Sequence, residues 1–352
     1  MKIGIRVDAN EIIATGHVMR CLAIADALGE RGEAPFFIAA DDFPRDIIAQ
    51  KGYTFYSLES DWRYMDGELE RLAQVIREQG IEILLVDSYY VTKSYLRQLR
   101  DLVKVVYIED LGKEIYPVDV VICYANYYKD FLLKEKYPPQ VKLFQGTKYV
   151  PLRSGFSNLP PKEISPKVRK LIVLSGGTDQ NDFLWKFSKR IRECPLFEML
   201  DVIHVICGKY YEKYDALIRE FAGTTQFRFH RAVDNIEDYM LSSDVAISAA
   251  GVTSYELCAV GVPTIIVTTA DNQQKNAESF YADGLMEYAG DLRHVPVLDR
   301  IIELLQGKYQ DFAYRKKISG AMQKKVDGKG AQRIAEKIDL FHNQAERNAY
   351  QK

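Results

Sequence analysis

Residues 6–28, RVDANEIIATGHVMRCLAIADAL, form the stretch that most clearly indicates the fold. They overlap a short apolar run at residues 2–7, which is typical of a buried strand. After a polar loop, apolar residues recur at helical spacing, which predicts a helix over residues 17–31 with His17 at its start. A strand, a loop and a helix in this order indicate the first unit of an α/β sheet.

His17 is the leading candidate for a general base. The first turn of a helix carries unsatisfied N–H groups and a partial positive charge, which favour a neutral imidazole there. Ligands of open α/β sheets bind beyond the carboxyl ends of the strands, where the loop after the first strand lies. Gly16 would let a ligand approach the backbone, and Asp8 is a further candidate for substrate binding. A histidine that only caps the helix or lines the core edge is the alternative.

Length and composition indicate a globular protein of two domains. The chain has 352 residues and a formal net charge of -2, which argues against binding nucleic acid through bulk positive charge. Its five cysteines are scattered without a CxxC pair or metal-ligand spacing, as expected of free thiols in a cytoplasmic protein. No signal-peptide pattern and no apolar run of membrane-spanning length occur in the sequence, so we expect a soluble cytoplasmic location.

Strand-like and helical segments alternate in two halves of the chain, which predicts two doubly wound, Rossmann-like α/β domains facing a cleft. Between the halves, residues 151–166, PLRSGFSNLPPKEISP, contain four prolines and three serines and read as a linker. We therefore expect domains at residues 1–152 and 153–352. The helices after about residue 297 are candidates for packing back on the first domain.

A glycine pair opens the first candidate phosphate site in the second half. Residues 174–182, LSGGTDQND, follow a predicted strand and precede a predicted helix. Gly176 and Gly177 allow close approach of a phosphate, and Thr178 with the N–H groups of the helix start can donate to it. An ordinary strand-to-helix turn is the alternative.

A second candidate nucleotide loop begins at Gly251, again between a strand and a helix. Thr253 and Ser254 lie where the helix starts and could hold a diphosphate. Glu256, in the first turn, can accept hydrogen bonds from both ribose hydroxyls, unless it is only a residue favoured by the helix dipole.

Three amides begin the next predicted helix and could bind sugar hydroxyl or acetamido groups, with ordinary capping as the alternative. They are Asn272, Gln273 and Asn276. No GxGxxG follows the first strand, which weakens a nicotinamide or flavin interpretation, and Asp41–Asp42 has no further ligand-type neighbours. We therefore expect neither a cofactor nor a metal.

Seven landmarks in order resemble one known family, the UDP-sugar hydrolase of pseudaminic acid biosynthesis with its related spore-coat polysaccharide proteins. The resemblance covers nearly the whole chain. The landmarks are residues 6–28, VDSYYV (86–91), IEDL (108–111), GTKYVPLRSGF (146–156), SGGTD (175–179), AISAAGVTSYELCAVGVP (246–263) with DNQ (271–273), and VDGKGAQRI (326–334).

The resemblance implies a fold like the type B glycosyltransferases, with UDP held by the second domain and the sugar facing the first. It implies that His17 is the base, that Tyr89 lies near the sugar and that Glu256 binds the ribose. Tyr89 could instead be an aromatic residue that caps the core. The chain departs from the family at Glu109–Asp110, where two aspartates are usual, and at residues 123–126, where amides are more usual.

The hypothesis from the sequence is metal-independent hydrolysis of a UDP-linked diacetamido trideoxy sugar, with His17 activating water. A UDP-sugar is the expected partner, and neither nucleic acid nor a membrane span is expected. A glycosyltransferase of the same fold and a non-catalytic nucleotide-sugar binding subunit are the alternatives, and the oligomeric state is left open.

Overall fold

The structure is a computed structural model. It describes residues 1–112, 114–177, 179, 181–209, 211–294 and 296–350, the last six by their backbone only. The chain forms two compact units: unit 1 is Met1–Ser154 with Gly328–Lys352, and unit 2 is Gly155–Asp327. This division differs from the expected second domain at 153–352, because the end of the chain packs on the first helix of unit 1.

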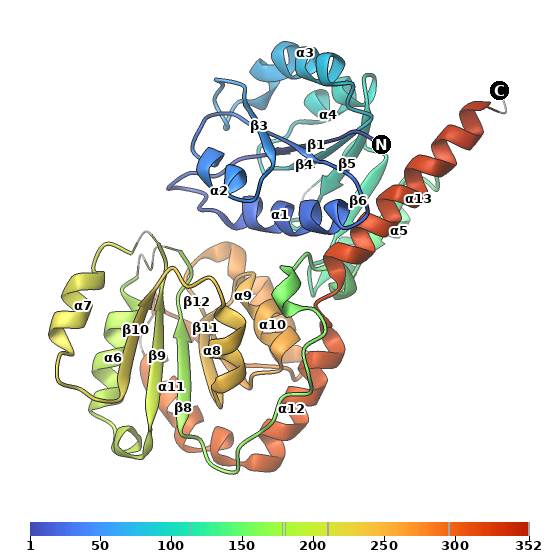
Figure 1. Cartoon of the computed structure of the whole chain (residues 1–352). Coiled ribbons are helices and arrows are strands. Elements are labelled where there is room, and N and C mark those ends of the chain that lie inside the picture. The colour runs from blue at the N-terminus through green and yellow to red at the C-terminus, as the bar shows by residue number, and fades with distance from the viewer. Residues whose placement is uncertain (113, 178, 180, 210, 295, 351–352) are drawn as a thin grey trace. The chain divides into compact units, whose positions relative to one another are not determined.

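Unit 1 is built on a seven-stranded, wholly parallel sheet with the order β3-β2-β1-β4-β5-β6-β7 (Figure 1). The strands are β1 (Ile3–Val7), β2 (Phe36–Ala39), β3 (Thr54–Ser57), β4 (Ile83–Asp87), β5 (Lys104–Ile108), β6 (Val120–Cys123) and β7 (Lys142–Gln145). The strand order reverses direction between β1 and β4, as in doubly wound folds. The side chains of β1 and β4 are buried on both faces, which explains their continuous apolar sequence.

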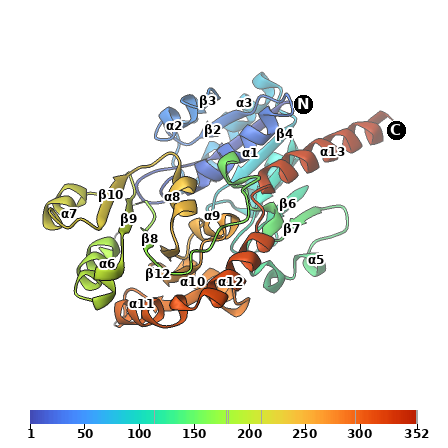
Figure 2. The same ribbon diagram turned by 60° about the horizontal axis from the view of Figure 1, so that its bottom comes forward.

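The helices of unit 1 follow the strands in the alternation that the sequence predicts. They are α1 (Gly16–Gly29), α2 (Arg45–Ala49), α3 (Leu69–Gln79), α4 (Lys93–Arg100), α5 (Leu133–Lys136) and α13 (Gly330–Tyr350). Helix α13 packs beside α1, as Figures 1 and 2 both show, and Arg31 forms an ion pair with Asp339 between the two helices. Gly330 begins α13 against the backbone of Val150, where a Cβ would lie 2.0 Å from the carbonyl oxygen.

Unit 2 repeats the design with a six-stranded parallel sheet in the order β10-β9-β8-β11-β12-β13. The strands are β8 (Lys170–Leu174), β9 (Val202–Cys207), β10 (Phe227–Arg231), β11 (Val245–Ala249), β12 (Thr264–Thr268) and β13 (Glu287–Asp291). The helices are α6 (Phe183–Arg192), α7 (Tyr214–Glu220), α8 (Ile236–Ser242), α9 (Thr253–Val260), α10 (Gln274–Ala282), α11 (Val297–Gln306) and α12 (Phe312–Lys325). The prediction of two doubly wound α/β domains is confirmed.

Strand β13 was not anticipated from the sequence. Its residues, EYAGD, lack an apolar run, and the register with β12 shifts between Ile266 and Val267. Gly290 has φ +120° at this irregularity, a conformation that other residues rarely adopt. Edge strands with a bulge carry a weak sequence pattern because only part of each face is buried.

The proline-rich segment that follows unit 1 is fixed to α12 by a buried arginine. Arg315 is 0% exposed and donates hydrogen bonds to the carbonyl oxygens of Ser165 (2.8 Å) and Pro166 (3.0 Å). Gln323, two turns further along α12, donates to the carbonyl oxygen of Pro160 at 3.0 Å. Backbone groups that cannot join a sheet are thereby satisfied by side chains.

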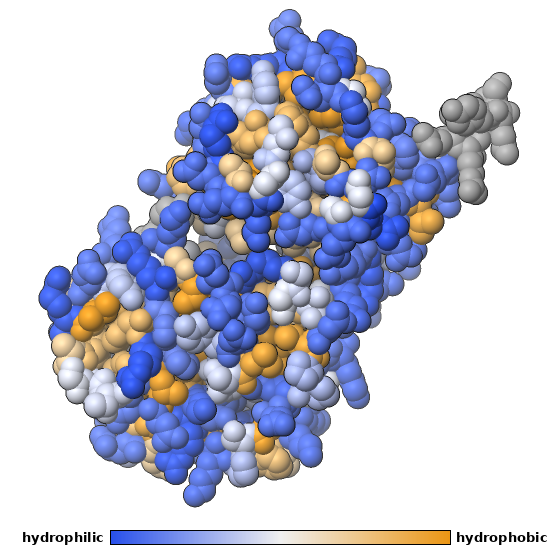
Figure 3. All heavy atoms as spheres, viewed as in Figure 1, coloured by the Kyte–Doolittle hydropathy of each residue, from blue (hydrophilic) through white to orange (hydrophobic). Residues whose placement is uncertain are grey.

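In the part of the chain that the structure describes, no helix is both long enough and apolar enough to cross a membrane. The face seen in Figure 3 is covered mainly by hydrophilic residues, with smaller hydrophobic patches between them.

Candidate functional site

His17 and Asp87 meet at the point where the strand order of unit 1 reverses. Asp87 is the last residue of β4, opposite Val7 of β1, and His17 lies in the first turn of α1, which follows β1. The Nδ1 atom of His17 lies 2.7 Å from Oδ1 of Asp87. In open α/β sheets this carboxyl edge is where ligands bind.

The loop between β1 and α1 is held in one conformation by its own side chains. Asn10 Oδ1 accepts hydrogen bonds from the backbone N–H groups of Ile12 and Ile13, both at 2.9 Å. Ala14 has φ +56°, an unfavourable conformation for a residue with a Cβ. Strain of this kind persists where surrounding contacts fix the backbone, and here it immediately precedes the helix that carries His17.

Asp87 is ionised in the folded protein. Burial alone would raise the pKa of the Asp87 carboxyl, but the Arg20 guanidinium and the His17 ring outweigh burial and hold this pKa well below its usual range. Arg20 donates through Nε to Asp87 Oδ2 at 2.6 Å and through Nη2 to Oδ1. A bidentate contact of this kind is among the strongest that a carboxylate makes.

The Asp87 carboxylate determines which nitrogen of His17 can accept a proton. Arg20 Nη2 also lies 2.9 Å from Nδ1, but an ionised carboxylate can only accept, so the 2.7 Å contact between Nδ1 and Asp87 Oδ1 requires a hydrogen on Nδ1. We therefore assign the Nδ1 hydrogen as a donor to Asp87, which leaves Nε2 as the acceptor. Across the described chain, no side chain forms a hydrogen bond with Nε2.

From the sequence, the partial positive charge of the helix start was expected to keep the His17 ring neutral. The structure adds a contact that the sequence did not predict, the Asp87 carboxylate at 2.7 Å from Nδ1. His17 is also only 8% exposed, so a ligand can reach it over a small part of the ring only.

Arg20 links this pair to two further side chains, which follow the neighbouring strands β5 and β6. Its Nη1 atom donates to Asp110 Oδ2 at 2.6 Å and to the hydroxyl of Tyr124. Sequence reasoning did not select Arg20 or Asp87, although Arg20 lies one helical turn after His17 and Asp87 ends a predicted strand. Asp110 and Tyr124 lie in the two segments where the chain departs from the family pattern, although Asp110 itself agrees with it, and the structure brings both into the His17 cluster.

Tyr89 covers one edge of the histidine. The two rings are edge to face with centroids 4.6 Å apart, and the Tyr89 hydroxyl donates to Asp110 Oδ2 at 3.1 Å. Tyr89 is 38% exposed, so a ligand can contact its ring. The structure thus brings Tyr89 together with His17 in unit 1.

Asp8 and Gly16 lie in the same loop but differ in accessibility. Asp8 is 5% exposed, and its Oδ1 accepts from Arg6 Nη1 (2.6 Å) and from the backbone N–H of Ala40 (2.8 Å). Arg6 is fully buried and also pairs with Glu68. Asp8 therefore neutralises a buried arginine through Oδ1, whereas its Oδ2 has no partner among the described residues. Gly16 is exposed, with open space where a Cβ would lie.

The glycine pair after β8 is exposed at the corresponding switch point of unit 2. Gly176 has φ +87° and open space above it, and Gly177 is exposed. Thr178 lies outside the described residues. Two of the N–H groups at the start of α6 that were expected to donate to a phosphate, those of Phe183 and Leu184, donate instead to the Asp179 carboxylate, each at 2.9 Å. The Asp179 side chain thus caps the start of α6 through N–H groups that were expected to bind a phosphate.

The loop after β11 lies across from the glycine pair, because β11 and β8 are neighbours in the sheet. A Cβ on Gly251 would meet no atom within 4 Å, and Thr253 begins α9 with Glu256 in its first turn. Ser254 is 0% exposed, and within the described residues its hydroxyl has no hydrogen-bond partner. A buried hydroxyl without a partner is uncommon in folded proteins and marks a place where a polar ligand or water would be favoured.

The three amides near α10 have different surroundings. Asn272 is exposed. Gln273 uses its Oε1 to accept from the backbone N–H of Thr269 at 2.9 Å. Asn276 is buried, where it accepts from Tyr255 and donates to the carbonyl oxygen of Ala250. The amide of Asn276 is thus used inside the protein, and it is not retained as a sugar contact.

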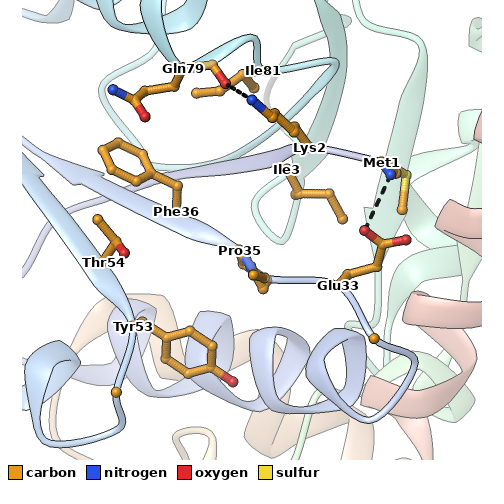
Figure 4. A pocket seen from close by; sticks show the side chains of 13 residues that line it. Met1, Lys2, Ile3, Glu33, Pro35, Phe36, Tyr53, Thr54, Gln79 and Ile81 are labelled. Carbon is orange, nitrogen blue, oxygen red and sulfur yellow. Dashed lines mark hydrogen bonds and ion pairs between the residues drawn. The ribbon is translucent and has the colours of Figure 1, made fainter.

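A pocket of about 500 Å³ lies elsewhere in unit 1, at the amino ends of the strands. Its lining includes the first residues of β1, β2 and β3, namely Ile3, Phe36 and Thr54 (Figure 4). It is therefore at the opposite sheet edge from His17. Within the described ranges, no group of three or more His, Cys, Asp or Glu side chains is arranged to hold a metal ion.

The comparison with known families gives a match in the second half of the chain. Residues 171–337 match the glycosyltransferase family 28 C-terminal domain. The chain is also 22% identical over 352 residues to the spore coat polysaccharide biosynthesis protein SpsG of Bacillus subtilis (strain 168). That alignment covers 98% of this chain and 99% of SpsG.

Solved structures show the same fold at low sequence identity. MurG of Acinetobacter baumannii is 12% identical with a TM-score of 0.69, covering 97% of this chain and 100% of MurG. MnaA of S. aureus, solved with UDP, is 13% identical with a TM-score of 0.67, and the match covers 97% of each chain. The chain thus has the two parallel-sheet α/β domains of the type B glycosyltransferases.

Proposed function

We propose that this protein is a nucleotide-sugar hydrolase that cleaves a UDP-linked diacetamido trideoxy sugar to UDP and the free sugar. The reaction would serve the biosynthesis of a surface polysaccharide or a pseudaminic-type acid. The observation that carries the proposal is the 2.7 Å hydrogen bond between His17 Nδ1 and Asp87, because it leaves Nε2 to accept a proton. The full-length similarity to SpsG supports the polysaccharide context.

In the proposed reaction, His17 Nε2 takes a proton from water while the water oxygen forms a bond to the anomeric carbon. The bond between that carbon and the phosphate oxygen breaks, and its electron pair leaves with UDP. A diphosphate is a good leaving group, so the reaction needs donors near the phosphate rather than a strong general acid. No metal or cofactor takes part in the proposed reaction.

Unit 2 is proposed to hold the nucleotide. The exposed backbone at Gly176 and Gly177 and the hydroxyls of Thr253 and Ser254 are suited to the diphosphate, and Thr178 was assigned with them from the sequence. Glu256, in the first turn of α9, is proposed to accept from the ribose hydroxyls. Asn272 and Gln273 remain candidates for the sugar, and Gly251 leaves room beside α9.

Transfer of the sugar to an acceptor hydroxyl is the second candidate function. The match of residues 171–337 to the family 28 glycosyltransferase domain favours it. The same histidine would then deprotonate an alcohol instead of water, so the His17–Asp87 geometry is compatible with both reactions. Water is retained as the first choice because seven landmarks of the sequence resemble the hydrolase family.

Incubation of the protein with a panel of UDP-diacetamido sugars in buffer alone tests the proposal. Release of UDP together with free reducing sugar is the expected result. UDP release that requires an added acceptor would establish transfer instead. Tight UDP binding without turnover of any UDP-sugar, with or without acceptors, would identify a binding subunit and contradict both enzymatic functions.

A further inference from the structure

One oxygen of the Asp110 carboxylate is buried without a hydrogen-bond partner among the residues that the structure describes. Asp110 follows β5, and its Oδ2 accepts hydrogen bonds from Arg20 Nη1 (2.6 Å) and from the Tyr89 hydroxyl (3.1 Å). Its Oδ1 is inaccessible to solvent, and no donor among the described residues lies within hydrogen-bond distance of it. Buried carboxylate oxygens normally accept at least one hydrogen bond, so this atom calls for an explanation.

The two donors fix the orientation of the carboxylate. Because Arg20 and Tyr89 both donate to the same oxygen position, a rotation that exchanged the two equivalent oxygens would leave the same position without a donor among the described residues. Arg20 is itself held by Asp87 and Tyr124, and Tyr89 packs on the ring of His17. The unpartnered oxygen therefore has a defined position.

This position belongs to the cluster around the proposed base. The Nη1 nitrogen of Arg20 contacts Asp110, and the Nη2 nitrogen of the same guanidinium lies 2.9 Å from His17 Nδ1. Tyr89 also connects Asp110 with His17, because its hydroxyl donates to Asp110 and its ring packs against the ring of His17. A sugar placed for attack next to His17 would bring its substituents to this group of side chains.

We propose that Asp110 is a specificity-determining residue whose Oδ1 accepts a hydrogen bond from an acetamido N–H of the sugar. This inference rests on the proposed function and names the residue that selects the substrate. An ionised carboxylate accepts hydrogen bonds but donates none, so it favours a substituent that carries a hydrogen over one that presents only oxygen. A site built to bind a donor rejects an analogue that lacks it.

The test compares two UDP-sugars that differ in one atom. In the analogue, an acetoxy ester replaces one acetamido group, so that shape is kept while the N–H is lost. Binding of each compound is measured by calorimetry, with UDP alone as reference, and kcat/KM is measured alongside. The wild-type protein is expected to prefer the amide by at least about 100-fold, as in sites that pair with a polar substrate group.

The informative variant is Asp110→Asn, which preserves size. The donors at the Oδ2 position hold the amide oxygen there, so the NH₂ group takes the Oδ1 position and faces the substrate N–H. The preference for the amide is expected to disappear or reverse. Tyr124→Phe is the matched control, since it also removes a contact to Arg20 but should keep the preference.

An unchanged preference in Asp110→Asn would overturn the inference, as would wild-type protein that binds neither sugar more tightly than UDP. If Asp110→Asn does not fold, Asp110→Ser is measured in the same way, and its preference is also expected to fall. The binding measurement needs no turnover. A shifted preference without hydrolysis would therefore support the proposed role of Asp110 and contradict the hydrolase function. Hydrolysis with an unshifted preference would support the hydrolase function and contradict the role of Asp110.

Discussion

The Asp87 carboxylate lies 2.7 Å from Nδ1 of His17, although the two residues are 70 positions apart in the sequence. The contact exists because β1 and β4 are neighbours in the sheet and end at the same edge. It fixes the tautomer of His17, whose Nε2 is left as an acceptor without a side-chain partner in the described part of the chain.

Replacing His17 by Gln should lower turnover by about 10²- to 10⁴-fold, the usual contribution of a general base. UDP binding should stay within the wild-type range, because the proposed nucleotide contacts are in unit 2. Steady-state hydrolysis and calorimetry with UDP check the two parts. Wild-type turnover in this variant would show that His17 is not the base.

Asp87→Asn should reduce turnover by an order of magnitude or more, since the amide cannot hold the His17 tautomer as a carboxylate does. Because the Asp87 pKa is held below its usual range in the folded protein, its contribution to stability is present above the unfolded pKa of about 4 and is lost as pH falls further. The variant should therefore lose less stability than wild type on acidification below about pH 4. Urea unfolding across pH measures this, and parallel curves would contradict the ion-pair assignment.

Ser254→Ala should leave the free energy of unfolding unchanged or slightly higher, because it removes a buried hydroxyl that lacks a partner within the described chain. The same change should weaken UDP binding by about 2- to 10-fold if the hydroxyl donates to a phosphate. Thermal unfolding with and without UDP separates the two effects. Thr225→Ala, at an exposed position, is the control. Equal UDP affinity in both variants would remove Ser254 from the nucleotide site.

The stability of unit 2 should fall between pH 6.5 and 4 because of His204. Burial, together with the nearby His230, Arg228 and Lys170, lowers the pKa of His204 to about 4. The folded state thus binds fewer protons than the unfolded state in this range, so stability is full above the unfolded pKa and is lost on acidification. His204→Gln should flatten the decline in urea unfolding. An unchanged slope would show that other groups cause the acid sensitivity.

The sequence was sufficient to predict the secondary structure wherever a local pattern of apolar residues determines it. Alternating apolar runs and helical spacing indicated β1, α1 and the two doubly wound sheets, because burial on both faces leaves a continuous apolar pattern in each central strand. Glycines and hydroxyl residues after β8 and β11 predicted loops there, and the two loops lie at neighbouring strand ends because β8 and β11 are paired. The edge strand β13 could not be predicted from the sequence, because a strand with a bulge has no continuous apolar pattern.

The tertiary structure decided the contacts within the His17 cluster. Asp87, Arg20 and Asp110 come from three separate elements, and only the strand order β1-β4-β5 brings them to one edge. It also showed that Asp8, Asp179 and Asn276 are used inside the protein, which their residue types alone do not reveal. Residue type determines what a side chain can bond with, but the partner it takes depends on distances set by the packed sheet.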